Sequence, residues 1–266
     1  MDLRSEEMME QQPDWEKIRE LVKGGDGEII WNHAIDLLNG NVTGGRVPMG
    51  DHKFNFIDFK EKRVLDIGCS NGFHSFLAEE RGASEVVSFD ICDEQFGEQK
   101  NEGKEWDFWV RGYLHAHQER NSNCKYIFPY SVYQLNKQVF GEFDVVLCLG
   151  VLYHLVHPGL ALENINKVMK IGSTLVVDSE VSPVLTSFYG PEHPYNKDKT
   201  NFWVMRREEL FRLLRFCGFE VVQEYHRVRD RQGIVLKKVR EIDPKYSVDN
   251  VYAKTTPLTN FKGTAP

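Results

Sequence analysis

The sequence predicts an α/β fold in which a mostly parallel sheet carries helices on both faces. Short apolar runs alternate with amphipathic helices from residue 63 onward, which is typical of parallel strands joined by crossover helices. A glycine turn, "GCSNG", joins the first apolar run to the first helix. The chain has 266 residues, of which 41% are hydrophobic and 27% are charged, as in globular proteins with a sizeable core.

The segments before residue 63 give weaker signals. "DWEKIRELV" predicts one short helix within residues 1–27, and "KGGDG" ends it. Residues 28–45, "EIIWNHAIDLLNGNVTGG", fit two patterns. Ile30, Ala34 and Leu37 share one face of a helix, whereas the alternation of apolar and polar residues in the same stretch fits a strand.

The regular elements follow one another from residue 63. Strands are predicted at "RVLDIG" (63–68), "SEVVSFD" (84–90), "CKYIFPY" (124–130), "FDVVLCLG" (143–150) and "STLVVDSE" (173–180), with helices near 72–81 and 160–169. A helix that Gly218 ends then leads into "FEVVQEYHRV" and "RQGIVLKKV", which predict an antiparallel terminal hairpin. The chain thus divides into an N-terminal segment (1–45), a main domain (46–240) and a C-terminal tail (241–266). Insertions at 92–124 and 181–202 lie where such sheets bind substrate.

Composition limits the classes of function. The formal net charge of -7 and the pI near 5.8 disfavour a generic nucleic-acid binder, which usually has a basic footprint. No apolar run reaches the roughly 20 residues of a membrane span, and we expect no secretory signal, because the first residues contain no apolar stretch. Five scattered cysteines without a C-x-x-C pair argue against a zinc site or a disulfide framework and favour a reducing, cytoplasmic location.

The last third of the chain is markedly basic despite the acidic total. We interpret these cations as solvated faces of helices and strands, with an RNA-binding surface as the alternative. They are Arg206, Arg207, Arg212, Arg215, Arg227, Arg229, Arg231, Lys237, Lys238 and Arg240.

The glycine turn predicts a cofactor that carries adenosine. In "LDIGCSNG", Gly68 and Gly72 permit a tight turn and the close approach of a ligand, and the next helix directs its N-terminal amides toward that ligand. Asp90 ends the second strand, where its carboxylate can accept two hydrogen bonds from a ribose diol. The turn lacks the G-x-G-x-x-G spacing of dinucleotide enzymes, and an anion at Asp66 repels phosphate but suits an ammonium group. The turn therefore favours S-adenosylmethionine (SAM) over NAD.

Four stretches together resemble class I SAM-dependent methyltransferases: "VLDIGCSNGFHSF", "VVSFDI", "FDVVLCLGVLYHLVHP" and the terminal hairpin. More narrowly, "GVLYHLVHP" and "TNFWVMRREELFRLLRFCGFE" resemble the group that contains tRNA wobble-uridine (carboxy)methyltransferases and their uncharacterised relatives. The likeness covers residues 28–240. It implies a Rossmann-like sheet of seven strands with the last hairpin antiparallel. One departure is Ser70, where many members have a third glycine.

The resemblance also implies the contacts with SAM. They are Asp66, Gly68 and Gly72 at the methionine part, Asp90 at the ribose, Ser131 and Val132 at the adenine, Leu149 and Gly150 beneath the sulfonium, and the adjoining Cys69 and Ile91.

Tyr153 and His154, just past the fourth strand, are the predicted catalytic residues. A methyl group on sulfonium is already activated, so the enzyme chiefly aligns the nucleophile. A base with a pKa near neutrality helps if the acceptor is a hydroxyl, and histidine is the usual choice. We expect His154 to act as that base or to touch substrate, with loop fixation as its alternative role, and Tyr153 to form a pocket wall. Asp178 and Glu180 face the same rim, and no metal site is required by their spacing.

Aromatic and histidine side chains from three segments are predicted to reach the acceptor. In similar enzymes the segment before the sheet folds over the cofactor as a lid. The predicted acceptor-side residues are Trp31, His33, Trp109, Tyr113, Tyr189 and Trp203.

The expected reaction is methyl transfer from SAM to an oxygen or nitrogen atom of a small molecule such as a sugar, a glycolipid or a secondary metabolite. A carboxylated SAM would need arginines near its extra anion, and Leu155 and Val156 stand where the wobble-uridine enzymes have them. The long N-terminal extension of those enzymes is also shortened. A tRNA wobble-uridine (carboxy)methyltransferase and a non-catalytic SAM-binding partner protein remain as alternatives, and the sequence does not indicate an oligomeric state.

Overall fold

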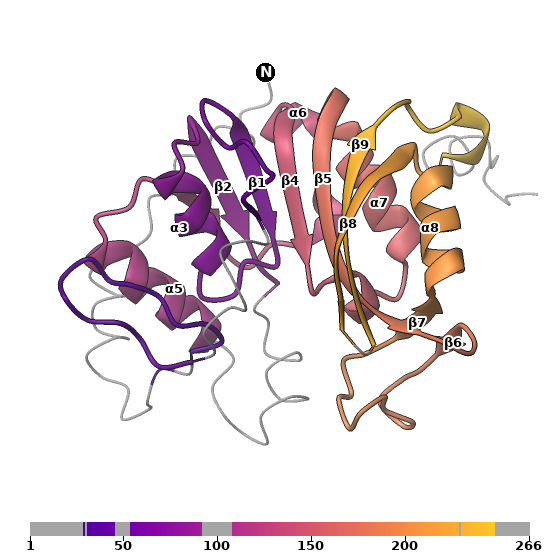
Figure 1. Ribbon diagram of the computed structural model, residues 1–266, viewed down its shortest axis with the longest axis horizontal. Coiled ribbons are helices and arrows are strands. Elements are labelled where there is room, and N and C mark those ends of the chain that lie inside the picture. Colours follow the sequence, from indigo (N-terminus) through magenta and orange to yellow (C-terminus); the bar gives the residue numbers. More distant parts are fainter. Residues whose placement is uncertain (1–28, 30, 46–53, 92–107, 229, 248–266) are drawn as a thin grey trace, which may run out of the picture.

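A central sheet organises the computed structural model, which describes residues 29, 31–45, 54–91, 108–228 and 230–247 (Figure 1). Within these residues seven strands lie in the order β3-β2-β1-β4-β5-β9-β8. All are parallel except β9, which pairs antiparallel with both β5 and β8. The strands are β1 (Arg63–Ile67), β2 (Glu85–Phe89), β3 (Lys125–Ile127), β4 (Phe143–Leu149), β5 (Met169–Ser182), β8 (Phe219–Val228) and β9 (Arg231–Lys238). The predicted mostly parallel sheet with its antiparallel C-terminal hairpin is confirmed, and two short strands, β6 (Ser187–Phe188) and β7 (Trp203–Arg206), extend it from seven strands to nine among the described residues.

Helices cover both faces of this sheet. Those on one face are α3 (Phe73–Glu80) and α5 (Phe108–Glu119), whose side chains share a core with Val64 and Val145. Those on the other are α6 (Lys137–Phe140), α7 (Pro158–Lys167) and α8 (Arg207–Phe216), which pack against Leu65 and Val146. Because adjacent strand residues point to opposite faces and both faces are covered, β1 is buried on both sides, and its apolar residues Val64, Leu65 and Ile67 are at most 1% exposed.

Residues 92–124 differ from the expected insertion. Their second half forms α5, which is the crossover helix between the parallel strands β2 and β3 and packs on the sheet like any other crossover helix. Residues 92–107 lie outside the described part of the chain.

Residues 181–202 form an excursion beyond the sheet, as expected. β5 runs on to Ser182, and β6 (Ser187–Phe188) pairs antiparallel with β7 (Trp203–Arg206). β7 in turn pairs with the far end of β5, so the excursion is anchored at its base. Figure 1 shows it beyond the carboxyl ends of β4 and β5, the edge at which parallel sheets bind ligands.

Residues 31–45, the continuously described part of the segment before the sheet, form neither the helix nor the strand that the sequence pattern allows. They form a turn closed by the bridge between Asp36 and Val42 and by the hydrogen bond from Thr43 N to Ile35 O (2.9 Å). Ile35 and Leu37 are buried against the α3 side of the sheet. The predicted helix of residues 1–27 and the tail beyond residue 247 lie outside the described residues, within which no helix is long and apolar enough to cross a membrane.

Asn166 ties the end of α7 to the C-terminal hairpin. It is 1% exposed, and its Nδ2 donates to the carbonyls of Cys217 (2.9 Å) and Arg240 (3.0 Å). Cys217 precedes β8 and Arg240 follows β9, so one side chain joins the chain entering the hairpin to the chain leaving it.

We expect Asn166→Ala to lower the free energy of unfolding by about 2–3 kcal/mol, because buried carbonyls that lose a donor keep their desolvation penalty. Urea denaturation measures the loss. The matched control is Asn41→Ala, whose side chain is exposed and whose effect should stay within about 0.5 kcal/mol. Equal effects of the two substitutions would contradict the assignment.

Candidate functional site

The loop after β1 is pressed against its neighbours and takes an unusual backbone path. Gly68, Ser70 and Gly72 all have positive φ, at 68°, 50° and 90°. A Cβ on Gly68 would lie 2.6 Å from Val151 Cγ2, and one on Gly72 would lie 2.7 Å from the rings of Phe76 and Tyr113. Both positions therefore require glycine, as the sequence predicts.

The same loop is tied to the end of β2. The amides of Gly68 and Cys69 donate to Phe89 O at 2.9 and 3.2 Å. Asp90 continues this contact, because its Oδ2 accepts from Ser70 N (2.8 Å) and its Oδ1 from Ile91 N (2.7 Å). Both carboxylate oxygens thus accept from backbone amides, which fixes the orientation of Asp90, and its contact with a ribose diol stays a prediction.

Asp66 lies beneath this loop at the end of a buried chain of hydroxyl groups. Tyr113 Oη donates to Ser88 Oγ (3.1 Å), Ser88 Oγ to Ser75 Oγ (2.8 Å), and Ser75 Oγ to Asp66 Oδ2 (2.6 Å). All four side chains are at most 1% exposed. Burial raises the pKa of Asp66 to about 7, with Ser75 opposing the rise and Asp90 adding to it. A cation bound here would favour the ionised form.

The N-terminal segment lies against the loop after β1, and its role as a lid stays a prediction. Asn32 N donates to Asn71 Oδ1 (2.8 Å), and Asn32 Nδ2 donates to Ser70 Oγ (2.6 Å). The ring of His33 lies 5.4 Å from that of Phe73. Asn32 is a contact that sequence reasoning missed, although it stands between the two residues singled out, Trp31 and His33.

The segment after β3 comes to the same edge. Tyr130 N donates to Asp90 O (2.8 Å), which places Ser131 and Val132 next to the end of β2. Ser131 begins a short 3-10 helix, η2 (Val132–Gln134), with a capping box in which Ser131 Oγ accepts from Tyr133 N (3.2 Å). The side chain of Val132 is 4% exposed and packs into the hydrophobic core at this edge of the sheet.

A cluster at the end of β4 brings together residues far apart in sequence. Gly150 has φ 76°, and a Cβ there would lie 3.5 Å from both Arg231 Nη2 and Tyr153 Oη. Arg231 Nη1 donates to Tyr153 Oη (3.1 Å), and Arg231 Nε donates to Asp178 Oδ1 (2.8 Å), which also accepts from Nη2. Burial raises the pKa of Tyr153, and Arg231 opposes that rise. Arg231 was missed from the sequence because arginine was sought only beside the Tyr-His pair.

His154 follows within the 3-10 helix η3 (Leu152–His154), and its ring lies 4.1 Å from that of Tyr153. Its Nδ1 is 3.0 Å from both the carbonyl oxygen and the hydroxyl of Thr200, in the 181–202 excursion. Phe202 N donates to Tyr153 O (2.8 Å), which fixes the excursion to the same turn.

Tyr189 and Trp203 stand on the β6–β7 ribbon. Trp203 Nε1 donates to Val156 O (3.0 Å), and Tyr189 N donates to Phe202 O (2.7 Å). The ribbon therefore adjoins the Tyr153–His154 turn, and the predicted role of both side chains toward an acceptor stays a prediction. The side chain of Trp109, at the start of α5, lies outside the described part of the chain.

Tyr113 does not line an acceptor pocket, contrary to expectation. Its side chain is 0% exposed, its ring centroid lies 5.2 Å from that of Phe128, and its hydroxyl donates a hydrogen bond to Ser88 Oγ. α5 is a crossover helix packed on the sheet, so this position faces the core.

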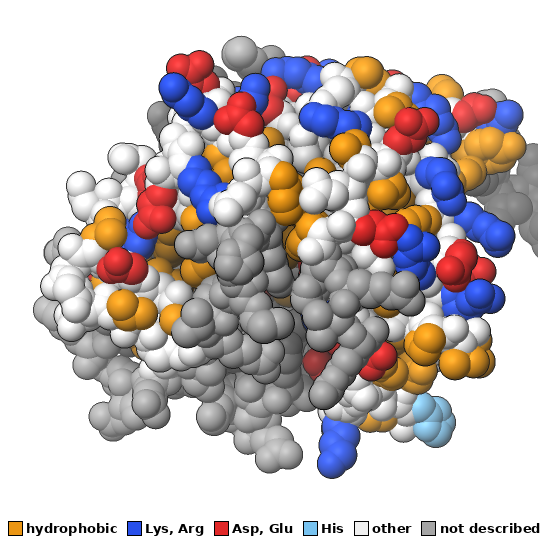
Figure 2. Space-filling model, viewed as in Figure 1, with side chains coloured by type: hydrophobic (Ala, Val, Ile, Leu, Met, Phe, Trp, Pro, Cys, Tyr) orange, Lys and Arg blue, Asp and Glu red, His pale blue; other side chains and the backbone are white. Residues whose placement is uncertain are grey.

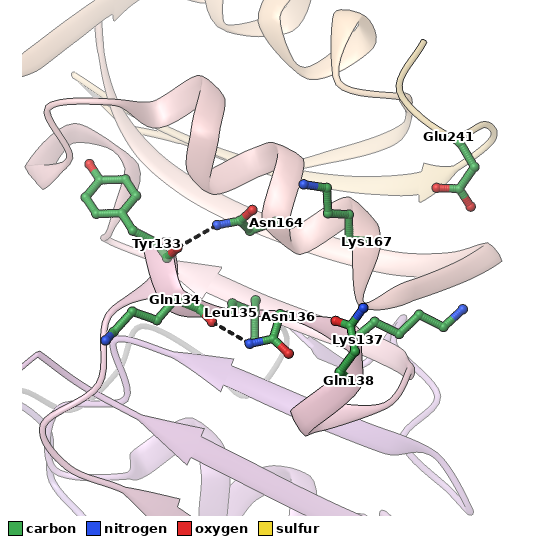
Figure 3. Close-up of a pocket in the computed structure, with 9 residues that line it drawn as sticks. All are labelled: Tyr133, Gln134, Leu135, Asn136, Lys137, Gln138, Asn164, Lys167 and Glu241. Carbon is green, nitrogen blue, oxygen red and sulfur yellow. Dashed lines mark hydrogen bonds between the residues drawn. The ribbon is translucent and has the colours of Figure 1, made fainter. Parts of the chain in front are cut away.

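An open polar pocket of about 580 Å³ lies between η2, α6 and α7 (Figure 3). None of the predicted site residues lines it. Its two lysines are already paired, Lys137 with Glu142 (2.8 Å) and Lys167 with Glu163 (3.0 Å). In the described ranges no group of three or more His, Cys, Asp and Glu side chains is arranged to hold a metal ion.

Asp90→Ala is expected to weaken SAM binding at least about tenfold, because buried charge-assisted hydrogen bonds are lost. Isothermal titration calorimetry measures the affinity. Glu220→Ala, an exposed carboxylate on β8, is the control and should bind SAM like the unmodified chain. An unchanged affinity in Asp90→Ala would refute the ribose assignment.

Asp66 should make the ligand-free protein less stable as the pH rises. Its pKa is raised to about 7 in the folded protein from 3.8, so between these values the folded state holds more protons and stability falls with pH. We expect Asp66→Asn to be stabilising, by about 2 kcal/mol more at pH 8 than at pH 5. Urea unfolding at both pH values tests this, with exposed Asp58→Asn as the control. A gain that is equal at the two pH values would show that Asp66 does not titrate in this window.

Comparisons with known proteins agree with this geometry. The family described as "Methyltransferase domain" matches residues 49–224. The tRNA U34 carboxymethyltransferase of Helicobacter acinonychis is 30% identical over 155 residues, which cover 56% of this chain and 53% of that protein. The chain thus spans about half the length of this curated relative.

Solved structures share the fold at low identity. The N-terminal domain of EvdMO1 with S-adenosylhomocysteine bound is 18% identical with a TM-score of 0.56, covering 87% of this chain and 99% of that one. The 1,6-didemethyltoxoflavin-N1-methyltransferase of Burkholderia thailandensis is 18% identical with a TM-score of 0.52, covering 68% of this chain and 72% of that one. These matches confirm the resemblance expected from the sequence: the chain belongs to the methyltransferase-domain family and has the class I SAM-dependent methyltransferase fold.

Proposed function

We propose that the chain transfers the methyl group of SAM to an oxygen or nitrogen atom of a small-molecule acceptor, such as a sugar, a glycolipid or a secondary metabolite. The observation that carries the proposal is the meeting of the loop after β1, fixed on Asp90, with the Tyr153–His154 turn along one sheet edge. Family membership supports methyl transfer, and the local charges support the choice of donor and acceptor.

The residues at this edge fit SAM. Asp90 offers two oriented oxygens to a ribose diol, and Ser131 with Val132 borders the space for an adenine. Ionised Asp66 suits the ammonium of the methionine part, and Gly150 leaves room for the sulfonium. Bound SAM would supply an activated methyl group, so the protein has only to align the acceptor and manage its proton.

His154 and Tyr153 are the residues proposed to do this. Tyr153 forms a largely buried wall beside Gly150. His154 would accept the proton that an acceptor hydroxyl loses while its oxygen bonds to the methyl carbon and the carbon–sulfur bond breaks.

The charges near the strand ends favour SAM over a carboxylated SAM. Arg231 is the one cation that adjoins Gly150 among the contacts described, and Asp178 accepts two of its N–H groups. A paired guanidinium offers little net charge to a second carboxylate.

Many of the C-terminal cations that the structure describes are paired with carboxylates, which weighs against tRNA. Figure 2 shows Lys and Arg side chains interspersed with Asp and Glu on the visible face. Carboxylate partners are recorded for Arg206, Arg207, Arg212, Arg231 and Lys238. RNA binding instead requires clustered cations that neutralise phosphates.

A tRNA wobble-uridine carboxymethyltransferase is the second candidate. It is favoured by the named activity of the curated relatives. It is also favoured by Arg231, because this arginine lies next to Gly150 although positions 155 and 156, where the wobble-uridine enzymes have arginines, are Leu and Val. A non-catalytic SAM-binding partner is the third candidate and would retain the cofactor site without any methylated product.

The deciding experiment identifies the nucleoside released from the purified protein by mass spectrometry and then titrates SAM and carboxy-SAM by calorimetry. We expect SAM or S-adenosylhomocysteine in the extract and a preference for SAM of about tenfold or more, since a second anion would meet a paired arginine.

Two variants sharpen this comparison. Asp178→Asn frees Arg231 and should shift the preference toward carboxy-SAM, and Arg231→Met should remove that shift. A preference for carboxy-SAM in the unmodified protein that Arg231→Met abolishes would instead establish the second candidate. SAM binding without methylation across an acceptor screen would support the third.

A further inference from the structure

The ring of His154 is held by two oxygen atoms of one residue. Thr200 is 0% exposed, and its carbonyl oxygen and its Oγ1 both lie 3.0 Å from His154 Nδ1. A carbonyl can only accept a hydrogen bond, whereas a hydroxyl can donate or accept. The direction of the hydroxyl bond therefore decides which ring nitrogen carries the proton.

Asp198 decides that direction. Its Oδ1 lies 2.5 Å from Thr200 Oγ1 and also accepts from Thr200 N (2.9 Å). The second bond favours the ionised carboxylate, which has no proton to give. The single hydroxyl proton of Thr200 thus goes to Asp198, and Oγ1 can act only as an acceptor toward His154.

The two Thr200 oxygens that lie 3.0 Å from Nδ1 are therefore both acceptors, so Nδ1 is the donor to them. We propose that Asp198 and Thr200 are positioning residues that hold neutral His154 as the Nδ1–H tautomer, which leaves the lone pair on Nε2. The inference rests on the proposed function, because it names Nε2 as the atom that takes the acceptor's proton. After that transfer the imidazolium keeps its Nδ1–H bond to Thr200.

The surrounding contacts keep the ring in this place. Phe202 N donates to Tyr153 O (2.8 Å), and the Tyr153 ring lies 4.1 Å from that of His154. Asn201, between Thr200 and Phe202, is 2% exposed. The end of the 181–202 excursion thus fixes the position and the tautomer of the predicted base.

Long-range ¹H–¹⁵N NMR of the full ¹⁵N-labelled chain tests the proposal without any acceptor. His154→Gln identifies the signals of His154, and His193, an exposed residue of the same excursion, is the internal control. At a pH where the ring is neutral we expect Nδ1 at the protonated shift and Nε2 at the unprotonated shift. The Nε2–H tautomer in the unmodified protein would overturn the proposal.

Variants test the role of the two residues. Asp198→Ala frees the Thr200 hydroxyl to donate to Nδ1, which should move the tautomer ratio toward Nε2–H by about fivefold, the effect of one net hydrogen bond. Adding Thr200→Val removes the competing donor, keeps the carbonyl and should restore Nδ1–H. A ratio that Asp198→Ala leaves unchanged, or that Thr200→Val fails to restore, would contradict the assignment.

Activity separates this inference from the proposed function. Once an acceptor is known, His154→Ala should lower turnover far more than SAM affinity. If turnover is unchanged while the NMR result holds, His154 is not the base, but Asp198 and Thr200 still set its tautomer.

Discussion

The hydrogen bonds between the loop after β1 and the end of β2 are the constraint on which the cofactor site depends. They exist because parallel pairing sets Ile67 opposite Phe89, so the two strands end level. The loop can then place the amides of Gly68 and Cys69 on one carbonyl and that of Ser70 on Asp90. Left-handed backbone at a non-glycine residue such as Ser70 costs about 1–2 kcal/mol, and these bonds offset that cost. The orientation of Asp90 is thus a property of the sheet rather than of one side chain.

Charged side chains at this edge are neutralised either by an ion pair or by a shifted pKa. Arg231 is neutralised by Asp178, and buried Asp66 has its pKa raised to about 7 so that it can hold a proton until a cation arrives. This arrangement is the basis for proposing a positively charged donor such as SAM rather than one with a second anion. Substitutions in the Asp178–Arg231 pair are therefore expected to change the preference between SAM and carboxy-SAM.

The strand segments of the sheet, the glycine turn and the acidic end of β2 were predictable because each is a local pattern set by strand burial or by positive φ. Tyr113 was assigned wrongly to an acceptor pocket because an aromatic side chain suits a pocket and a core equally well. Only the path of α5 as a crossover helix shows that Tyr113 belongs to the core. Arg231 and Thr200 were not found because their partners, Tyr153 and His154, lie 78 and 46 positions away in the sequence. Such pairings follow from the antiparallel insertion of β9 and from the return of the excursion, which no local pattern encodes.

The placement of β9 between β5 and β8 has a consequence for synthesis of the chain. The strand nearest the C-terminus in this sheet is an internal one, and it brings Arg231 to Gly150 and Asp178. A nascent chain that has released β1 to β5 can pair those strands but still exposes the edge of β5 and leaves Asp178 without its guanidinium. Domains generally fold as units, so the transfer site is completed only when almost all of the described chain has left the ribosome. Among the described strands, β9 is made last, and its synthesis therefore decides when Arg231 reaches Gly150 and Asp178.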